Sequence, residues 1–524
     1  MIEWLANRTV TCRCPVCGSL AAHQAMLRSP SMFDPAKRLL FLACAACGSG
    51  FFDDRRPPDY QGDGSADFPI KFYVEKGASI DAMLRPIAAL PFPAGTRYLE
   101  IGCGFGFSLD FVARHYRAEV MGIDPAGMAA EGSRRLGLAI VSDYFGPALR
   151  SRVGPRDVVY CSELIEHVED PAQLLTDIAA VLTPGGILVL TTPAMEAISP
   201  ETPAGALLPA LSPGSHLILY SAGSLDLLLR RHGFTEIRIV RDAHTLVAHA
   251  SRGAALPPWR EAISAEALID YLAGRYAASA GDALLENGFL FRLVKHLVIA
   301  GRFAEARTLA PAVDTQFRDL YGIDIDHPAD LALPVLAPGA TLPEVIARLP
   351  LNLANHLHFR GLVELIDGHD GARAAASFMA AARLAAGMRD ALHRYLISDG
   401  ELEACVGACL KMTVFALRTL PAAAATRQVP MVVDTLRRLL DGRPVTAVLG
   451  TDGPSDLDAL AALGRDIGGE ARDLLESLPG IAKPAGDIGL AAGAVQDDAR
   501  VDGSERGLLR GMLRRASGYL GLRR

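Results

Sequence analysis

The sequence of 524 residues has no excess of positive charge and no long uncharged apolar run. Lysine and arginine total 52 against 59 aspartate and glutamate, a formal net charge of -7. General nucleic-acid binders usually carry a positive surface, so this balance argues against that class. No uncharged apolar stretch reaches the roughly 18 residues needed to span a bilayer, and the first residues do not resemble a secretory signal. We therefore expect a cytoplasmic protein.

The composition is that of a globular protein with several domains. Half of the residues are hydrophobic and 21% are charged, which supplies ample material for buried cores. The length exceeds one ordinary core and suggests about three domains. Nine cysteines in a cytoplasmic protein of this size indicate metal binding or simple burial rather than disulfides.

Two Cys-x-x-Cys turns, each followed by glycine, lie near the N-terminus. Their members are Cys14, Cys17, Cys44 and Cys47. Four thiolates can complete a tetrahedral zinc site with no open position, so a zinc ion here would be structural. We expect residues 26–42 to form a hairpin that brings the turns together, within a metal-dependent zinc-ribbon-like domain over residues 1–56. Unpaired buried thiols are the alternative interpretation.

Three glycines at alternate positions follow a short apolar run in YLEIGCGFGFSLDF, residues 98–111. The run predicts a buried strand, the glycines a turn without side chains, and the remainder a helix. In doubly wound sheets such a turn packs against a nucleotide-like ligand, which glycines allow to come close. The spacing G-x-G-x-G differs from the G-x-G-x-x-G of dinucleotide sites.

Acidic residues and further strands follow in a regular order. A second expected strand, residues 119–123, ends at Asp124, where a carboxylate can accept hydrogen bonds from both hydroxyls of a ribose. Strands are also expected over residues 139–143, 157–161 and 186–192, with helical stretches between them. This alternation predicts a parallel sheet covered on both faces.

In this order the motifs resemble the class I methyltransferases that use S-adenosylmethionine. The resemblance covers residues 96–250 and rests on YLEIGCGFG, GIDP, DVVYCSELIEHVEDP and LTPGGILVLTTP. Residues 233–250 look like the antiparallel strand pair that closes the sheet in that family. The resemblance implies an α/β fold, a Rossmann-like seven-stranded core, here preceded by the zinc ribbon and followed by an all-α domain.

The same resemblance implies S-adenosylmethionine as the cofactor. It assigns the glycine turn to the methionine part of the cofactor, Asp124 to the ribose, and Asp143 with Tyr144 to the adenine. The cofactor-binding residues expected in this way are Glu100, Gly102, Cys103, Gly104, Gly106, Asp124, Pro125, Asp143, Tyr144 and Glu163. A glycine turn that serves only strand-to-helix packing is the alternative.

Glu166, His167 and His216 are the candidate catalytic residues. His167 follows the fourth strand, at the edge where ligands of α/β folds bind, and could act as a general base. Together with Glu163, the three also resemble the magnesium-binding arrangement of some small-RNA 2'-O-methyltransferases, and a divalent ion could polarise an acceptor hydroxyl. Alternatively Glu166 and His167 only orient the loop beside the cofactor, and His216 has no chemistry. The loop over residues 193–213 could cover the acceptor.

The sequence pattern of the C-terminal half predicts helices without strands. Residues 284–309 are typical of two helices joined by a tight turn, and residues 355–381 are a looser copy. We expect a helical accessory domain over residues 260–450, either tetratricopeptide-like or plain. Residues 57–95 are expected to form a linker and leading helix.

The last segments differ in composition. Residues 451–504, rich in Ala, Gly and Asp, are expected to be flexible. Residues 505–524 hold six arginines and one glutamate, and predict a basic amphipathic tail that docks on a partner or on the inner face of an anionic membrane.

We expect a methyltransferase whose acceptor is a hydroxyl of a sugar, nucleotide-sugar or surface glycan. Zinc knuckles before such a core resemble methyltransferases of sugar and surface-polysaccharide pathways, which is an analogy. A small aromatic or quinone acceptor is the nearest rival. An interaction protein that binds the cofactor without turnover, and an NAD-dependent oxidoreductase, are alternatives of other classes. Binding of adenosylhomocysteine against NAD would separate the last of these.

Overall fold

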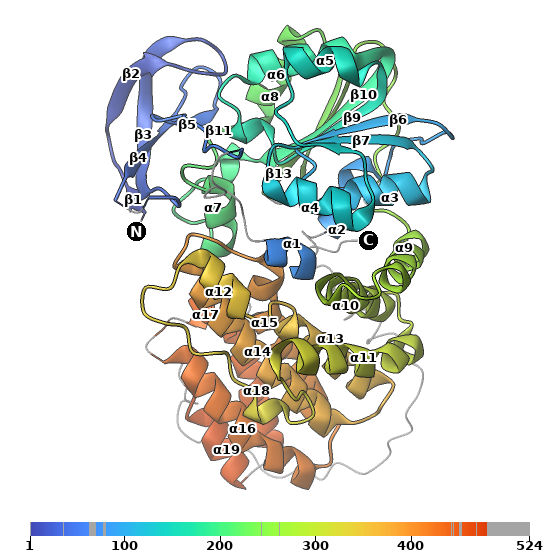
Figure 1. Cartoon of the computed structure of the whole chain (residues 1–524). Coiled ribbons are helices and arrows are strands. Elements are labelled where there is room, and N and C mark those ends of the chain that lie inside the picture. Colours follow the sequence, from blue (N-terminus) through green and yellow to red (C-terminus); the bar gives the residue numbers. More distant parts are fainter. Residues whose placement is uncertain are drawn as a thin grey trace. The chain divides into compact units, whose positions relative to one another are not determined.

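The computed structural model divides the chain into two compact units (Figure 1). It describes residues 2–34, 36–61, 70–76, 80–242, 244–260, 262–441, 443, 445–449, 453–467 and 469–478. The first unit holds Met1–Tyr271 together with Thr341–Ala347 and Leu392–Ser398, and the second holds the rest. The ribbon and the expected methyltransferase core therefore belong to one compact unit.

The first unit is built on a seven-stranded sheet in the order β12-β13-β10-β9-β6-β7-β8. Figure 1 labels β6, β7, β9, β10 and β13 of this sheet. The strands are β6 Arg97–Ile101, β7 Glu119–Ile123, β8 Ile140–Val141, β9 Arg156–Ser162, β10 Leu182–Pro193, β12 Glu236–Asp242 and β13 Thr245–Ser251. Strands β6 to β10 pair in parallel, and β13 pairs antiparallel with both β10 and β12. The expected seven-stranded, Rossmann-like fold is confirmed.

Helices follow the strands in alternation. In this part of the chain they are α1 Ile70–Lys76, α2 Ile80–Leu84, η2 Arg85–Ile87, α3 Phe107–His115, α4 Gly127–Leu136, α5 Pro147–Val153, η3 Ile165–His167, α6 Pro171–Val181, η4 Met195–Ala197, α7 Ala204–Leu211 and α8 Ala222–Arg231. Local signals set their starts: Asp170 accepts a hydrogen bond from the Gln173 backbone N–H before α6, and Ser221 forms a capping box with Ser224 before α8.

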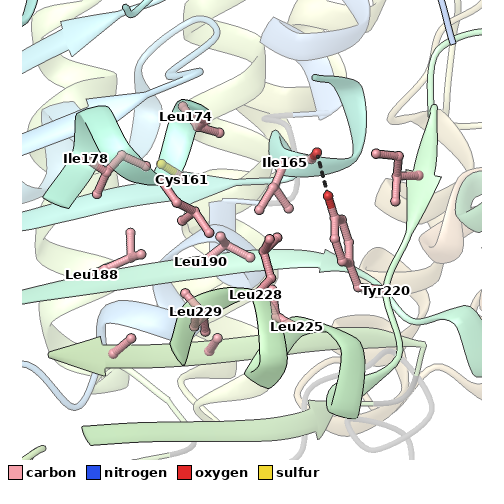
Figure 2. Packing of buried hydrophobic residues seen from close by; sticks show 14 of the residues in the cluster. Cys161, Ile165, Leu174, Ile178, Leu188, Leu190, Tyr220, Leu225, Leu228 and Leu229 are labelled. Carbon is pink, nitrogen blue, oxygen red and sulfur yellow. Dashed lines mark hydrogen bonds between the residues drawn. The ribbon is translucent and has the colours of Figure 1, made fainter. Parts of the chain in front are cut away.

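One buried cluster joins β9 and β10 to α6 and α8 (Figure 2). Leu190 of β10 lies in this cluster with Leu229 of α8. Tyr220 ends the segment before α8, and its hydroxyl donates to the carbonyl oxygen of Ile165 at 3.4 Å. This contact ties the start of α8 to the turn that carries the candidate catalytic residues.

The ribbon sheet includes a strand from the core part of the chain. Its strands are β1 Glu3–Trp4, β2 Thr9–Arg13, β3 Leu20–Pro30, β4 Arg38–Ala43, β5 Gly50–Phe52 and β11 Ile218–Leu219. The path runs β1-β3-β4-β5-β11, with β2 paired to β3. The hairpin expected over residues 26–42 is confirmed by the antiparallel pairing of β3 and β4. Because β11 belongs to this sheet, residues 218–219, which precede helix α8, are extended.

The segment expected as a loop over residues 193–213 is anchored against the ribbon. It contains η4 and α7, and Leu207 and Leu211 of α7 share a buried cluster with Leu27 and Phe41 of the ribbon. Burial of these side chains in one cluster stabilises the junction. Helix α7 therefore holds this segment against the ribbon, and the segment is not a free loop.

The second half of the chain is helical, as expected. Its helices are α9 Ala265–Ala278, α10 Ala283–Ile299, α11 Phe303–Tyr321, η5 Pro328–Asp330, α12 Leu342–Arg348, α13 Leu353–Ile366, α14 Gly371–His393, α15 Gly400–Arg418, α16 Ala422–Leu440, α17 Val445–Leu449, α18 Gly453–Ile467 and α19 Gly469–Glu476. The predicted helix–turn–helix over residues 284–309 is present, with Gly301 at φ +78° in the turn. A tetratricopeptide-like arrangement stays a prediction.

The expectation of a flexible segment over residues 451–504 is wrong for its first part. Helices α18 and α19 occupy 453–467 and 469–476, and Leu460 and Leu475 in them are fully buried. Apolar residues at helical spacing outweighed the small-residue composition. The rest of that segment and the basic tail, residues 505–524, lie outside the described residues. Across the described helices, none is both long and apolar enough to cross a bilayer.

Candidate active site

The glycine turn lies between β6 and α3 and has left-handed backbone at all three glycines. Gly104, with φ +52°, differs from Gly106 in its surroundings. A Cβ at Gly106 would come within 2.9 Å of Leu138, whereas a Cβ at Gly104 would meet nothing closer than the Met128 sulfur at 3.9 Å. Gly106 is therefore required for packing, and Gly104 borders open space where a ligand can approach.

Asp124 connects this turn to the loop after β7. Its Oδ2 accepts the backbone N–H of Gly104 and its Oδ1 accepts that of Ala126, both at 2.8 Å. The side chain thus has a structural function that the sequence did not indicate. A carboxylate offers about four lone-pair sites, so two ribose hydroxyls can still be accommodated. Pro125, next to it, is half-buried.

Glu100 and Cys103 are enclosed beneath the turn. Both oxygens of Glu100 already accept hydroxyl hydrogen bonds, from Ser108 at 2.5 Å and from Tyr98 at 3.4 Å. Burial raises the pKa of Glu100 to about 8. Burial also raises the pKa of the Cys103 thiol well above its usual range, so the thiol stays protonated and serves packing.

Asp143 and Tyr144 lie exposed after β8, and an earlier part of the chain meets them. The backbone N–H of Tyr60 donates to the Tyr144 hydroxyl at 3.1 Å, and the Gln61 amide donates to Asp143 at 3.2 Å. From the sequence this segment is predicted to be a linker, because no motif in it indicates ligand binding. The expected adenine side of the site therefore has a second wall.

Tyr60 contacts both the expected cofactor-binding residue Tyr144 and the loop at Ser215. Burial raises the pKa of its phenol, a hydrogen bond with Ser215 lowers it, and the carboxylates of Asp124 and Glu166 raise it further. Tyr73 of α1 is also near: burial, then the charges of Asp124 and Tyr60, raise its pKa to about 12. Two tyrosines that sequence reasoning missed thus lie in the electrostatic field of the site.

Glu166, His167 and His216 lie close together in the fold. His216 is distant from the other two in the sequence, since its neighbour Ser215 comes 48 positions after His167. One ligand atom from each lies within 4.8 Å of the others. Glu166 is fully buried, and Thr192 donates to its Oε2 at 2.9 Å, but its Oε1 has no hydrogen-bond partner. That oxygen is 3.8 Å from His167 Nε2. A buried carboxylate oxygen without a partner is costly unless a ligand completes it.

Both histidines contact a backbone carbonyl oxygen through Nδ1, which leaves Nε2 as the nitrogen available to a ligand. His167 Nδ1 lies 3.0 Å from the Ser215 carbonyl oxygen, and His216 Nδ1 lies 2.8 Å from that of Ala210. Carbonyl oxygens only accept, so each Nδ1 carries the proton and each Nε2 carries a lone pair. Burial lowers the pKa of His167 to about 4. Burial, then the charge of His167, lowers that of His216 to about 3.

Glu163 begins the same turn at the end of β9. Its backbone has φ +49°, and Thr191 donates to its side chain at 2.9 Å. Much of the residue is exposed, while desolvation of its carboxyl group raises the pKa of that group to about 7. Burial, then the charge of Glu163, raises the pKa of Glu166 well above its usual range. The turn therefore holds two carboxyl groups whose ionised forms are disfavoured by burial.

The four expected zinc ligands form a second cluster in the ribbon. Their sulfurs lie within 4.8 Å of one another, with Cys14 to Cys47 at 3.8 Å and Cys17 to Cys44 at 3.7 Å. Both turns have the same geometry, because the glycine after each has φ +74° and donates to the first cysteine's carbonyl at 3.0 Å. Hydrogen bonding, chiefly from Cys47, lowers the pKa of Cys14 to about 4. Cys12 is not part of this cluster.

The strand order and the glycine turn define the fold of a class I methyltransferase. Residues 77–239 match the family described as a methyltransferase domain. A trans-aconitate 2-methyltransferase of Methylobacterium nodulans is 30% identical over 214 residues, 38% of this chain and 82% of the relative. The chain therefore belongs to this family and is an S-adenosylmethionine-dependent methyltransferase.

Other matches cover less. A ubiquinone biosynthesis O-methyltransferase of Xanthomonas axonopodis pv. citri is 35% identical over 115 residues, 21% of this chain and 48% of the relative. Against relatives of that name the chain thus spans less than half of their length. Among solved structures, an O-methyltransferase family protein from Burkholderia thailandensis is 15% identical, with a TM-score of 0.32, covering 38% of this chain and 66% of its own.

Proposed function

We propose that the protein O-methylates a hydroxyl of a sugar, nucleotide-sugar or surface-glycan acceptor, with a divalent cation held by Glu166, His167 and His216. The observation that carries the proposal is the convergence of these three residues with one carboxylate oxygen and two imidazole lone pairs unused. It favours a cation over the two other interpretations. A loop-orienting role would not need three unfilled ligand atoms.

A general base is favoured less by the same geometry. The lowered pKa values of about 4 and about 3 keep His167 and His216 neutral at pH 7 but make them weak proton acceptors. Neutral imidazole is the form that binds metal. One carboxylate with two imidazoles suits a first-row transition ion better than Ca²⁺ or Mg²⁺, and Mn²⁺ is the member of that series that also accepts oxygen ligands readily, as an acceptor hydroxyl would require.

The proposed reaction uses both the cofactor-binding residues and the candidate catalytic residues. S-adenosylmethionine supplies an electrophilic methyl group on a sulfonium. As the acceptor oxygen bonds to the methyl carbon, the carbon–sulfur bond breaks, sulfur keeps the electron pair, and the hydroxyl proton must leave. A bound cation would supply Lewis acidity that lowers the pKa of that hydroxyl.

The protein's own residues supply alignment. The turn at Gly104 and the carboxylate of Asp124 orient the cofactor, and the segment from Ser215 to His216 orients the acceptor. Alignment of this kind can contribute roughly 7 to 11 kcal/mol to lowering a barrier. Glu163, whose pKa is raised to about 7, is suited to take up the proton that leaves the acceptor hydroxyl.

We also propose that the four ribbon cysteines hold a structural zinc ion. Four thiol sulfurs, with backbone turns of matching geometry, fit a closed tetrahedral site. The ribbon's own core is small, so metal binding would contribute directly to its folding. Native mass spectrometry should detect one zinc ion that is lost in the Cys14→Ser/Cys17→Ser variant and kept in Cys12→Ser.

A quinone or other small aromatic hydroxyl is the second candidate acceptor. The local identity to relatives named ubiquinone biosynthesis O-methyltransferase favours it. Both acceptors are hydroxyls, so the same cation chemistry would serve.

The test is a search for labelled products with methyl-tritiated cofactor. The zinc-loaded protein is given sugars, nucleotide sugars, surface polysaccharide and catechols, with Mn²⁺ or with a chelator. We expect label in a glycan-type fraction that depends on Mn²⁺. Label only in catechols would favour the second candidate acceptor. Equal labelling with Mn²⁺ and with the chelator would contradict a role for the cation.

A further inference from the structure

The ribbon carries a surface cleft that the reaction described above does not use. Its volume is about 600 Å³, and its lining is Glu3, Arg8, Arg28, Arg38, Leu40 and Asp53. Ligand sites commonly measure about 300 to 1,000 Å³. The cleft is thus large enough for a charged group and the atoms next to it.

Strand register places the lining residues together. Glu3 of β1 pairs with Arg28 of β3, and Arg28 pairs with Leu40 of β4. Residues directly opposite in an antiparallel sheet share a face, and Arg38 lies two positions before Leu40 on that same face. The cleft is therefore built by three neighbouring strands, with the half-buried Leu40 as its apolar part.

The arginines of the cleft outnumber its carboxylates by one. Within the described part of the chain, none of Arg8, Arg28 and Arg38 forms an ion pair, whereas Arg56, close by, pairs with Asp54 at 2.7 Å. Asp53 is engaged with backbone, since its Oδ1 accepts the N–H groups of Leu40 and Asp54. Three guanidinium groups thus face two carboxylates, which leaves the cleft with net positive charge.

The cleft lies in line with the acceptor side of the site. Phe51 pairs with Ile218, and the Phe52 N–H donates to the Leu217 carbonyl at 3.0 Å. The next step of this register places Asp53 opposite His216. Arg28 is then three strands from His216, about 14 Å at the usual strand spacing of about 4.8 Å.

The same end of the ribbon also contacts the acceptor loop. The N–H of Met32, in the turn between β3 and β4, donates to the Pro213 carbonyl oxygen at 2.9 Å. A Cβ at Gly214 would lie 2.6 Å from the Ser31 hydroxyl, so the turn and the loop are in close contact. The ribbon therefore places its arginines beside the loop that carries Ser215 and His216.

We propose that Arg8, Arg28 and Arg38 bind an anionic group of the acceptor, a phosphate or a carboxylate, while a hydroxyl of the same molecule reaches His216. The inference rests on the proposed function and narrows it to acidic acceptors: sugar phosphates, nucleotide sugars or uronic-acid glycans. Arginine binds both groups through paired N–H donors in a planar fork. A neutral quinone has no group for this cleft.

The experiment measures binding without methyl transfer. The full-length, zinc-loaded protein, saturated with adenosylhomocysteine, is titrated calorimetrically with inorganic pyrophosphate. In Arg28→Gln/Arg38→Gln we expect the Kd to rise at least tenfold. The control is Arg152→Gln, an exposed arginine of α5, which should bind as the wild type does. All three proteins should bind adenosylhomocysteine equally.

Two further probes separate the sources of the charge. Uridine diphosphate represents nucleotide sugars, and digalacturonate represents acidic glycans. The ligand that binds more tightly indicates which class of acceptor carries the anionic group. Equal pyrophosphate affinity in the double variant, or no binding to the wild type, would overturn the proposal. Because no turnover is measured, either result leaves the proposed methyl transfer to its own test.

Discussion

The cofactor half and the acceptor half of this site are built in different ways. Most of the cofactor half comes from one continuous part of the chain, residues 97–144, to which the segment at Tyr60 and Gln61 is added. Its main contacts are backbone groups around Gly104 and Asp124. The acceptor half is assembled from separated segments, the turn at Glu166, the loop at His216, and the ribbon strands beside it. The first half is mostly local and the second depends on the whole fold.

The two halves also differ in whether their buried carboxylate oxygens have hydrogen-bond donors. Both oxygens of Asp124 have donors within the protein, whereas Oε1 of the fully buried Glu166 has none. The cofactor half is complete before its ligand binds, and the acceptor half is incomplete. This unpartnered oxygen is the observation on which the proposed cation rests.

The largest effect is expected from Glu166→Gln, which removes the only carboxylate among the three ligands. We expect kcat to fall at least about 100-fold, or about 2.7 kcal/mol. Adenosylhomocysteine affinity should stay within about twofold, since the cofactor half is intact. Glu169→Gln, an exposed neighbour, is the control. Equal loss of cofactor binding in Glu166→Gln would break the separation of the halves.

Asp124→Ala tests the other half. We expect adenosylhomocysteine binding to weaken by about 1 to 3 kcal/mol through lost hydrogen bonds to a charged group, measured by calorimetry. The melting temperature should fall as well, because Gly104 and Ala126 lose an acceptor for their N–H groups. Mn²⁺ affinity should not change. Unaltered cofactor affinity would remove Asp124 from the site.

His216→Gln tests the buried, neutral imidazoles through pH. The folded pKa of about 3 is below the ordinary value, so His216 stabilises the fold relative to the variant above about pH 6.5 and loses this as pH falls. From pH 7.5 to 5 the wild type should lose about 2 kcal/mol of unfolding free energy relative to the variant. Denaturant titrations at both pH values, with chelator present, measure it. A pH-independent difference would contradict a depressed pKa.

The smallest effects are expected where Tyr60 joins the halves. Tyr60→Phe removes the hydroxyl that bonds Ser215, and should raise the KM for acceptor a few-fold, about 0.5 to 1.5 kcal/mol. Tyr144→Phe removes the oxygen that accepts the Tyr60 N–H, and should weaken cofactor binding by a similar amount. Steady-state kinetics in both substrates compare them. Reversed effects would show that the halves are assigned wrongly.

Sequence reasoning succeeded where short-range patterns carry the structure. The glycine spacing, the acidic end of β7 and the doubled Cys-x-x-Cys turn each depend on a few neighbouring residues. It failed where distant pairing decides. Nothing in Ile218–Leu219 signals a strand, because β11 exists only through its partner β5. Tyr60 was missed for the same reason, since its neighbours come from distant parts of the chain.

For the candidate catalytic residues the sequence supplied identities but not geometry. Glu166 and His167 were found from one motif, and His216 from another. The tautomers that leave a lone pair on both Nε2 atoms are set by the carbonyl oxygens of Ser215 and Ala210, which no motif indicates. The choice between base, cation and structural roles depends on these contacts.

The most direct test is an electron paramagnetic resonance titration of the zinc-loaded protein with Mn²⁺ in the presence of adenosylhomocysteine. Occupancy of the acceptor half predicts one tightly bound Mn²⁺ with nitrogen couplings from imidazole, absent in His167→Gln/His216→Gln. A wild-type protein that binds no Mn²⁺, or a variant that binds it equally well, would contradict the account.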